Sequence, residues 1–384
     1  MKTSDAGTPK TQAARFDALP AASQMALARH IVDTRAGELK LAHDNLLMVT
    51  AGYRSQRDAQ GRAMFHPQPC VIFGVARKWS GEGGTDEPEA QRLPRFLPVY
   101  GTRRGRRHVY EVPTDVQPAG WFRGAVARTT SSVWASAPEN YGTLACAVRV
   151  QTPAGTKSFG LSAMHVLSPW AQMDLAVPNA GEAVYPTGAA TAVGASTQWG
   201  GGLRENAPSF DVQLAAIGDS PWFSAAFSGW SLPAGRPHVR TRKEFDTLAA
   251  TQSFMILAPA NHPVHPDRGP MMAQFRSYAG SDVPIVYKVS VDGVRTRMHV
   301  RHRELMQLEV TPNSPAPAEG DSGSAVVTWR LDGSLVLAGM FIASVDGAAD
   351  RVAYMLPAWE LFDLSNWASL PPGTTRMTPR FSFP

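Results

Sequence analysis

The chain has 384 residues, 43% of them hydrophobic and 18% charged, which is enough apolar material for a buried core and excludes a wholly disordered protein. Two cysteines cannot build a disulfide framework, no apolar run is long enough for a spanning helix, and 33 glycines with 31 prolines favour a turn-rich β protein. The net charge of +5 comes entirely from the first 140 residues, so an acidic partner would meet that region.

The front of the chain predicts a small α/β unit behind a polar tail. We expect residues 1–20 to form a disordered tail. Apolar residues recur at helical spacing over residues 21–44, which predicts one amphipathic helix with a break near Gly37. Apolar, β-rich runs that predict strands occupy Asn45–Tyr53, Cys70–Trp79 and His108–Val116. The whole N-terminal α/β extension is expected over residues 21–135.

From Gly142 onward the sequence consists of short apolar runs separated by Gly and Pro turn signals. This texture predicts a mainly β body. We expect a first β-barrel over residues 136–230 and a second over 231–368. Apolar residues near helical spacing over 357–367 predict a C-terminal helix within the second part, and residues 369–384 an extended tail.

The segment Gly320-Asp321-Ser322-Gly323-Ser324 carries the clearest chemical signal. A serine here can be a nucleophile if the chain turns tightly around it, and the glycines on both sides of Ser322 permit such a turn. In such a turn the backbone amides of Gly320 and Ser322 can point at one spot and stabilise an oxyanion. The alternative is an ordinary glycine-rich turn, because Asp-Ser-Gly is common turn chemistry.

A serine hydroxyl is inert at neutral pH without a base, and chain order restricts the choice. All ten histidines precede Ser322, which excludes the Ser, Asp, His order of the α/β-hydrolases. His165 ends a predicted strand among small and apolar residues, and Asp211 begins an apolar strand, as an acid that orients an imidazole would. Asp174 and Asp219 are the rival acids, but Asp174 lies too near His165 in the chain. A satisfied core histidine is the alternative for His165.

These three segments resemble those of the trypsin/chymotrypsin-like serine peptidases, in the same order, and the whole resembles a bacterial, non-secreted type with an N-terminal extension. The likeness covers about residues 140–368. It implies a two-barrel chymotrypsin-like fold in which His165 is the general base, Asp211 the orienting acid and Ser322 the nucleophile. It also implies an oxyanion hole made by the amides of Gly320 and Ser322. No cysteine flanks Ser322, and no Ile-Val-Gly-Gly start is present to pair with Asp321.

The resemblance also suggests where a substrate side chain would bind. In the family, the residue six before the nucleophile lies at the base of the primary pocket, which is Ala316 here. The pocket wall is expected over 342–347, with Ala343, Ser344 and Val345 lining it. An alanine supplies no charge, so we expect a small or apolar residue at the cleaved bond. The carboxylate of Asp346 near the rim would favour a basic residue at the cleaved bond, which is the alternative.

The sequence thus predicts a serine endopeptidase (a hydrolase) that cleaves protein or peptide substrates through a catalytic triad and an acyl-enzyme, without a cofactor. We expect its N-terminal region or a regulatory protein partner to gate the site. A non-catalytic peptide-binding protein on the same fold is the alternative, and an esterase-type hydrolase is a further one. The first 20 residues contain no apolar stretch of the kind a secretory signal needs, so we expect a cytoplasmic protein; a secreted protein with its signal removed is the alternative.

Other features carry weaker signals. The arginine-rich run over 103–107 is more typical of a solvated loop, so we expect no nucleic acid partner and no membrane contact. Two histidine pairs suggest a metal site, His262 with His265 and His299 with His302. Neither pair has a third ligand nearby, so we expect no metal. We expect Cys70 and Cys146 to be buried thiols.

Overall fold

The computed structural model describes most of the chain, which divides into two compact units. The front unit comprises residues 1–119 with 277–279, and the rear unit comprises residues 120–276 with 280–384. The described residues are 12–43, 46–57, 63–75, 93–103, 106–118, 122–124, 132–134, 141–168, 178, 180–186, 191–204, 208–217, 223, 227, 230–258, 270–279, 284–291, 294–312, 314–318, 320–345 and 351–382.

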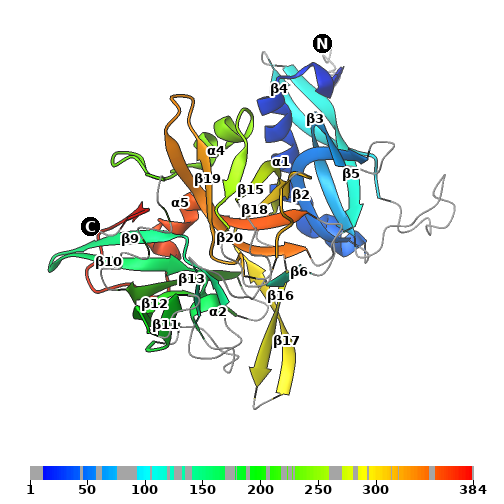
Figure 1. The fold of residues 1–384 in the computed structure, drawn as a ribbon. Helices are drawn as coiled ribbons and strands as arrows, with labels where there is room; N and C mark the ends of the chain where they lie inside the picture. The colour runs from blue at the N-terminus through cyan, green and yellow to red at the C-terminus, as the bar shows by residue number, and fades with distance from the viewer. Residues whose placement is uncertain are drawn as a thin grey trace, which may run out of the picture. The chain divides into compact units, whose positions relative to one another are not determined.

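The front unit consists of one long helix and a set of paired strands (Figure 1). Its elements are β1 (Gln12–Ala14), η1 (Phe16–Ala18), α1 (Ala21–Ala42), β2 (Leu46–Arg57), β3 (Ala63–Val75), β4 (Phe96–Arg103) and β5 (Arg106–Pro118). Strand β5 pairs in parallel with β1 and β3 and antiparallel with β4, and β3 pairs antiparallel with β2. Because β1 and η1 fold onto this unit, the prediction of a disordered tail over 1–20 is wrong for residues 12–18.

Helix α1 confirms the predicted amphipathic helix. It buries Met25, Ala28, Ile31 and Leu39 and packs against β2 and β3. The predicted break at Gly37 is wrong, because the helix continues through it without interruption. A glycine inside a helix costs about 1 kcal/mol relative to alanine. The buried residues on both sides of Gly37 offset that cost by packing.

The rear unit contains a closed, six-stranded antiparallel barrel. Its strands follow one another around the barrel as β14 (Phe254–Ile256), β15 (Met271–Ala279), β18 (Leu305–Val310), β21 (Val352–Pro357), β20 (Leu335–Val345) and β19 (Ala325–Trp329), which pairs again with β14. All residues of β14 and β21 are buried. Closure leaves these strands no free edge, which suits the short apolar runs seen in the sequence.

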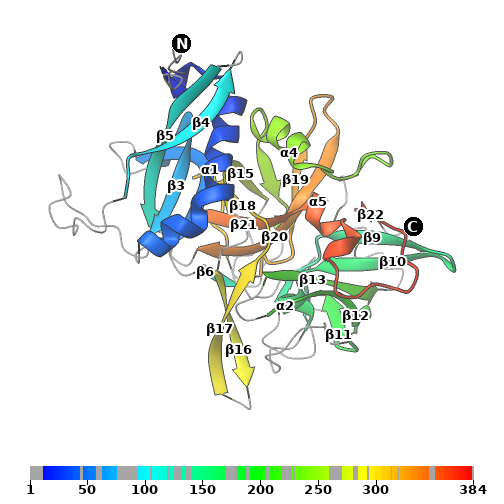
Figure 2. The ribbon, with the colours of Figure 1, turned by 180° about the vertical axis from the view of Figure 1, so that it is seen from behind.

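A second antiparallel sheet in the rear unit carries Asp211 on one strand, and another of its strands leads into the short helix of His165. Its strands are ordered β22 (Arg376–Arg380), β9 (Cys146–Thr152), β10 (Gly155–Ser162), β13 (Pro208–Ile217), β12 (Gly194–Gly202) and β11 (Ala183–Pro186). Figure 2 shows these strands from behind, apart from the barrel. Residues 369–384 are therefore not a tail outside the fold, because β22 completes one edge of this sheet.

Shorter elements connect the barrel and the second sheet. They are β6 (Phe122–Gly124), β7 (Ser132–Trp134), β8 (Tyr141–Thr143), β16 (Pro284–Val291), β17 (Val294–His302), α2 (Met164–Leu167), α4 (Arg242–Ala249), α5 (Ala358–Leu361) and η3 (Leu364–Asn366). The single C-terminal helix predicted over 357–367 is wrong. Asp363 interrupts it, because its side chain accepts a hydrogen bond from the amide of Ser365 and caps a separate 3-10 turn, η3.

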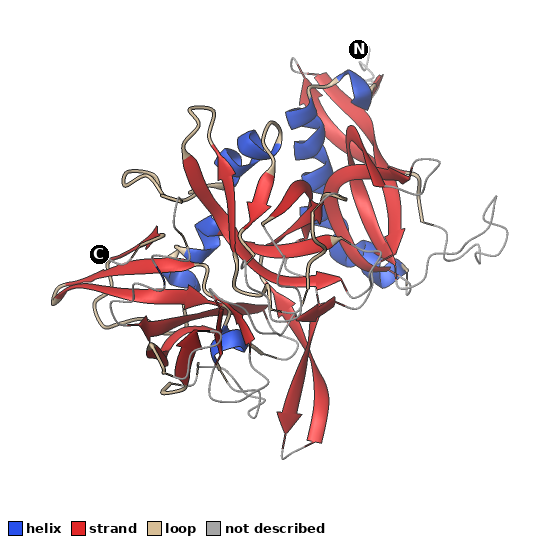
Figure 3. Cartoon of the chain, in the orientation of Figure 1, coloured by secondary structure: helices blue, strands red, loops and turns tan. Residues whose placement is uncertain are grey.

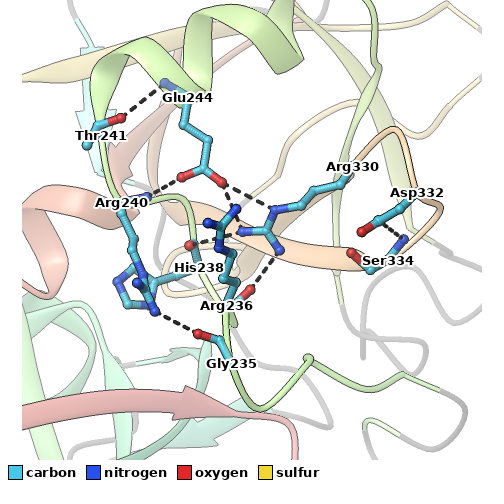
Figure 4. A network of polar contacts seen from close by, with 9 residues as sticks. All are labelled: Gly235, Arg236, His238, Arg240, Thr241, Glu244, Arg330, Asp332 and Ser334. Carbon is cyan, nitrogen blue, oxygen red and sulfur yellow. Dashed lines mark hydrogen bonds and ion pairs between the residues drawn. The ribbon is translucent and has the colours of Figure 1, made fainter.

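A polar network fastens α4 to the turn between β19 and β20 (Figure 4). Thr241 caps the helix by accepting from the amide of Glu244 at 3.1 Å, and the Glu244 carboxylate accepts from the amide of Arg240 at 2.9 Å. The guanidinium of Arg330, just after β19, donates to Glu244 at 2.9 Å and to the carbonyl oxygen of Arg236 at 2.7 Å. We call these residues the Glu244 network.

Strands dominate the chain, as Figure 3 shows, so the predicted mainly β fold class is confirmed. A closed barrel plus a second sheet is compatible with the expected two-barrel fold. The domain boundaries expected at residues 135 and 230 stay predictions. Among the described helices, none combines the length and the apolar character that crossing a membrane requires.

Candidate active site

His165 and Asp211 form a buried, doubly connected pair. His165 lies in α2, a single turn that directly follows β10, and Asp211 lies on the neighbouring strand β13. The ring nitrogen Nδ1 of His165 is 2.5 Å from Oδ2 of Asp211, and the backbone amide of His165 donates to Oδ1 at 3.1 Å. A carboxylate bound to Nδ1 fixes the tautomer in which Nε2 carries the lone pair. The structure thus places the expected base and acid in direct contact.

The charge of Asp211 follows from its surroundings. Burial would raise the pKa of this carboxyl, but the charge and hydrogen bond of His165, with smaller contributions from His302 and Tyr287, lower it to about 2. Asp211 is therefore ionised at neutral pH and can stabilise a protonated imidazole on His165. The rival acids Asp174 and Asp219 lie outside the described residues.

Ser322 lies in a turn that only glycines can make. The φ angles of Gly320 and Gly323 are 97° and 88°, in the left-handed region. A Cβ on Gly323 would come within 1.9 Å of the carbonyl oxygen of Thr143. The Ser322 hydroxyl donates a hydrogen bond to the carbonyl oxygen of Ile342 at 2.9 Å. The tight turn predicted from the sequence is confirmed.

The short strand β8 connects the Ser322 turn to the His165 helix. The Thr143 amide donates to the carbonyl oxygen of Ser322 at 2.7 Å, and the Thr143 hydroxyl donates to that of Gly320 at 2.8 Å. The Thr143 carbonyl in turn accepts from the hydroxyl of Ser162, three residues before His165, at 2.6 Å. Strand β8 thereby holds together the Ser322 turn and the segment before His165, which are far apart in the sequence.

Gly142 shows how closely the two segments approach each other. A Cβ added there would lie 2.2 Å from the side chain of Val166 and 2.9 Å from the carbonyl oxygen of Ser322. Val166 directly follows His165 in α2. The structure therefore brings all three predicted triad residues into one small region, with the Ser322 hydroxyl directed to Ile342.

The backbone amides expected to form an oxyanion hole are buried with the turn, and Ser322 itself is 0% exposed. Within the described chain, neither Gly320 nor Ser322 donates a hydrogen bond from its amide. The intervening Asp321 is buried, and its Oδ2 accepts from the amide of Ala318 at 2.8 Å. The carboxylate thus helps to close the turn from inside.

The expected pocket residues lie beside this turn. Ala316 and Ser344 are half-buried and Ala343 is fully buried, whereas the side chain of Val345 and residues 346–347 lie outside the described set. At this point β20 pairs antiparallel with β6, whose register places Ala343 opposite Gly124. The backbone edge of the expected pocket wall is thus already occupied by another segment of the chain.

One described cavity lies away from the triad. It measures about 220 Å³ and is lined by residues 230–234, 237 and 378–382. None of the candidate site residues lines it, so it adds nothing to the chemistry of Ser322.

Two residues at the site were not found from the sequence. The hydroxyl of Tyr287 donates to Oδ2 of Asp211 at 2.8 Å, and its oxygen lies 2.9 Å from Nε2 of His302. The sequence suggested His302 only as one half of a metal pair with His299, and no group that could hold a metal ion occurs among the residues described. Tyr287 gave no signal, since it sits in an apolar strand pattern typical of any buried strand.

The structure describes only some of the other residues that the sequence singled out. Cys70 and Cys146 are buried thiols as predicted, and burial raises the pKa of both well above the ordinary value. The pair His262 and His265 lies outside the described residues, as do the side chains over 103–107.

A search with protein-family models and a search of curated protein sequences each found no match.

Proposed function

We propose that this chain is a serine endopeptidase. The observation that carries the proposal is the buried His165–Asp211 pair, together with the glycine turn of Ser322 held on the strand next to it. Acyl transfer requires a base with a fixed tautomer, a nucleophilic serine and backbone N–H groups that can bind an oxyanion. The chain offers His165, Ser322 in its glycine turn, and the amides of Gly320 and Ser322.

The mechanism uses these groups in sequence. The Ser322 hydroxyl turns away from Ile342 and gives its proton to Nε2 of His165 as its oxygen attacks the substrate carbonyl carbon. The amides of Gly320 and Ser322 stabilise the resulting oxyanion. His165 then protonates the leaving amine, and a water molecule, deprotonated by His165, hydrolyses the acyl-enzyme. Asp211 stays ionised throughout and stabilises the imidazolium.

The proposal includes a gate formed by strand β6, which belongs to the rear unit. Strand β6, within the predicted N-terminal extension, pairs with β20 at Ser344 opposite Arg123. Its register ends at Gly124 opposite Ala343, one residue from Ile342, which binds the Ser322 hydroxyl. An extended peptide binds a sheet edge through the same backbone hydrogen bonds. A substrate strand therefore competes with β6 for the edge of β20.

The proposed specificity follows from the uncharged residue at the expected pocket base. Ala316 and Ala343 offer no charge to a substrate side chain, and Ser344 offers a hydroxyl. We expect small or apolar residues before the cleaved bond. Peptides that differ only at that position, with Ala, Leu or Arg, measure this preference through their kcat/KM values.

The test of the proposed function is labelling with a fluorophosphonate, read as intact mass. The native chain should gain a single adduct, and Ser322→Ala should gain none. Ser324→Ala is the matched control, because it removes a buried hydroxyl of the same turn that has no hydrogen-bond partner among the described residues. An unlabelled, folded native chain, or an adduct that persists in Ser322→Ala, contradicts the proposal.

A second candidate function is a peptide-binding protein without catalysis, favoured by the hydrogen bond of Ser322 to Ile342 instead of a base. Peptide hydrolysis separates the two: a binding protein would retain a labelled peptide intact, whereas the endopeptidase would cleave it. Comparing peptide with ester substrates of the same side chain separates the endopeptidase from an esterase-type hydrolase.

A further inference from the structure

Asp211 accepts a hydrogen bond that does not come from His165. Within the described chain its carboxylate accepts from the amide and Nδ1 of His165, and also from the hydroxyl of Tyr287 at 2.8 Å. Tyr287 lies on β16 and is only 1% exposed. Its ring also meets the ring of His165 edge-on, with centroids 5.1 Å apart. Tyr287 thus contacts both members of the pair.

The protons in this group can be assigned by counting. An ionised carboxylate has no proton to give, so the single proton of the Tyr287 hydroxyl goes to Asp211. The tyrosine oxygen is then an acceptor, and Nε2 of His302, 2.9 Å away, must be the donor. His302 is therefore the neutral tautomer protonated at Nε2.

The surroundings of His302 agree with that tautomer. The residue is fully buried, and burial lowers its pKa to about 4. Its Nδ1 has no hydrogen-bond partner among the residues described. A lone pair without a partner is tolerated there, whereas a buried N–H of a charged imidazolium without one would be costly.

The backbone fixes His302 and Asp211 relative to each other. Strand β17 ends beside the start of β13, with His302 opposite Ser209, two residues before Asp211. The amide of Arg303 adds a hydrogen bond to the carbonyl oxygen of Ser209 at 3.2 Å. The position of His302, and through it the tyrosine hydroxyl, is thus set by the strand that carries the acid.

We propose that Tyr287, oriented by His302, is a positioning residue that fixes the Asp211 carboxylate for His165 and so extends the His165–Asp211 pair to a four-residue relay of hydrogen bonds. The inference rests on the proposed peptidase function. Without the tyrosine hydroxyl, Oδ2 loses one of its two donors in a buried site, and only the two contacts with His165 still hold the carboxylate.

The first experiment uses Tyr287→Phe, which keeps the ring and removes only the hydroxyl. A hydrogen bond to a charged group corresponds to about a tenfold to hundredfold effect, so we expect kcat for a peptide substrate to fall by that factor, with KM unchanged. The acid limb of the kcat/KM profile should also change, because the carboxylate that holds the base His165 has lost a hydrogen bond.

The matched control is Tyr354→Phe. Tyr354 is also fully buried in a strand of the rear unit, and its hydroxyl accepts a hydrogen bond from Gln307 at 3.0 Å. Both variants should lower the melting temperature by similar amounts, but only Tyr287→Phe should change kcat and the pH profile. Equal kinetics in the two variants would overturn the proposal and leave Tyr287 a structural residue.

Substitutions of His302 test the second step of the relay. His302→Gln keeps an N–H donor for the tyrosine oxygen, and His302→Leu removes it. We expect His302→Leu to lower kcat about fivefold, as loss of one neutral hydrogen bond would, and His302→Gln to restore most of it. If both variants lower kcat equally while remaining folded, His302 does not act through its N–H.

The failure of this inference can be told apart from the failure of the proposed function. If the native chain neither reacts with a fluorophosphonate nor cleaves peptides, the function is wrong, and the relay is then read from the NMR chemical shift of the His165 Nδ1 proton. Tyr287→Phe should move that signal, because it removes a donor from the carboxylate that accepts this proton, and Tyr354→Phe should leave it unchanged. An unchanged signal in both variants would overturn the relay.

Discussion

Two polar networks in the rear unit use similar residues and differ in their burial. In the network around Asp211, the side chains of Asp211 and His165 are 0% and 1% exposed. In the Glu244 network, the side chains of Glu244 and Arg330 are 26% and 12% exposed, and Arg240 is on the surface. Each network contacts one histidine with a lowered pKa: His302 is fully buried, and His238, whose backbone oxygen accepts from Arg330, is half-buried.

The difference in burial determines what each network can do. Because these side chains are buried from solvent, each proton around Asp211 is assigned to one particular atom. Moving it to another atom would leave a buried polar group without a hydrogen bond. The network can therefore fix a tautomer, which a catalytic base requires. Around Glu244, water can replace a lost partner, so the contacts stabilise α4 against the barrel by a modest amount. Experiments that change each network should separate chemistry from stability.

The largest expected effect comes from Asp211→Asn. The amide keeps the shape but removes the charge and favours the wrong tautomer of His165, so kcat/KM should fall about 10⁴-fold. The paired substitution Glu244→Gln makes the same chemical change in the other network and should leave kcat/KM within twofold. Steady-state kinetics on one peptide measures both, and equal losses would contradict the assignment of Asp211.

The next effect is a loss of stability in mild acid, to which both networks contribute. The folded pKa values of His302 and His238 are about 4, below the unfolded value near 6.5, chiefly because burial disfavours the charged ring. Between pH 6.5 and pH 4 the unfolded chain therefore binds more protons, and the free energy of unfolding falls as the pH is lowered. The loss should reach about 3 kcal/mol for each histidine.

Urea unfolding at several pH values between 7 and 4 measures this dependence. His238→Gln and His302→Gln should each flatten it, because glutamine does not titrate. The second variant belongs to the Asp211 network, but its amide keeps an N–H donor for Tyr287, so most of kcat should be retained in both variants. A free energy of unfolding that stays constant between pH 6.5 and pH 4 would show that neither ring is held neutral in the folded chain.

A smaller effect is expected at the gate. Arg123→Pro removes a backbone N–H from β6, which pairs with β20 on one side and β16 on the other. Loss of one net hydrogen bond weakens the strand by about 1 kcal/mol, so kcat/KM for a long peptide should rise about fivefold. Arg123→Ala keeps the amide and serves as the control. If the proline variant is slower than the alanine variant, β6 supports the site and does not obstruct it.

The smallest expected effect belongs to the Glu244 network. Thr241→Ala removes the cap of α4 and should lower the free energy of unfolding by about 1 kcal/mol without changing kcat/KM. Thr241→Ser keeps the hydroxyl and should restore most of the stability. Denaturation curves of both variants and of the native chain measure these differences in the free energy of unfolding.

The sequence predicted the parts of the site that carry local signals. Glycines around Ser322 indicated a turn with positive φ, and the apolar surroundings of His165 and Asp211 indicated buried positions on or beside strands. Tyr287 and His302 gave no such signal, because their role depends on how β17 pairs with β13. Pairing between distant strands is set by tertiary packing, which spacing along the chain does not encode.

The same reason explains the errors in the fold. The apolar pattern over 357–367 is compatible with one helix, yet the local hydrogen bond of Asp363 to the Ser365 amide ends it. Residues 376–380 read as a tail because their strand character appears only when they meet β9. The α1 helix was predicted well, because a long periodic pattern needs no distant partner to be recognised.

The pairing of β22 with β9 has a consequence for how the chain is made. At about 5–20 residues per second, synthesis passes from β9 to β22 in about 10 to 50 seconds, and during that interval the edge of β9 has no partner. Ser322 leaves the ribosome before the sheet behind His165 and Asp211 is closed. We therefore expect the sheet that carries Asp211 to become fully paired only after residue 380 has emerged.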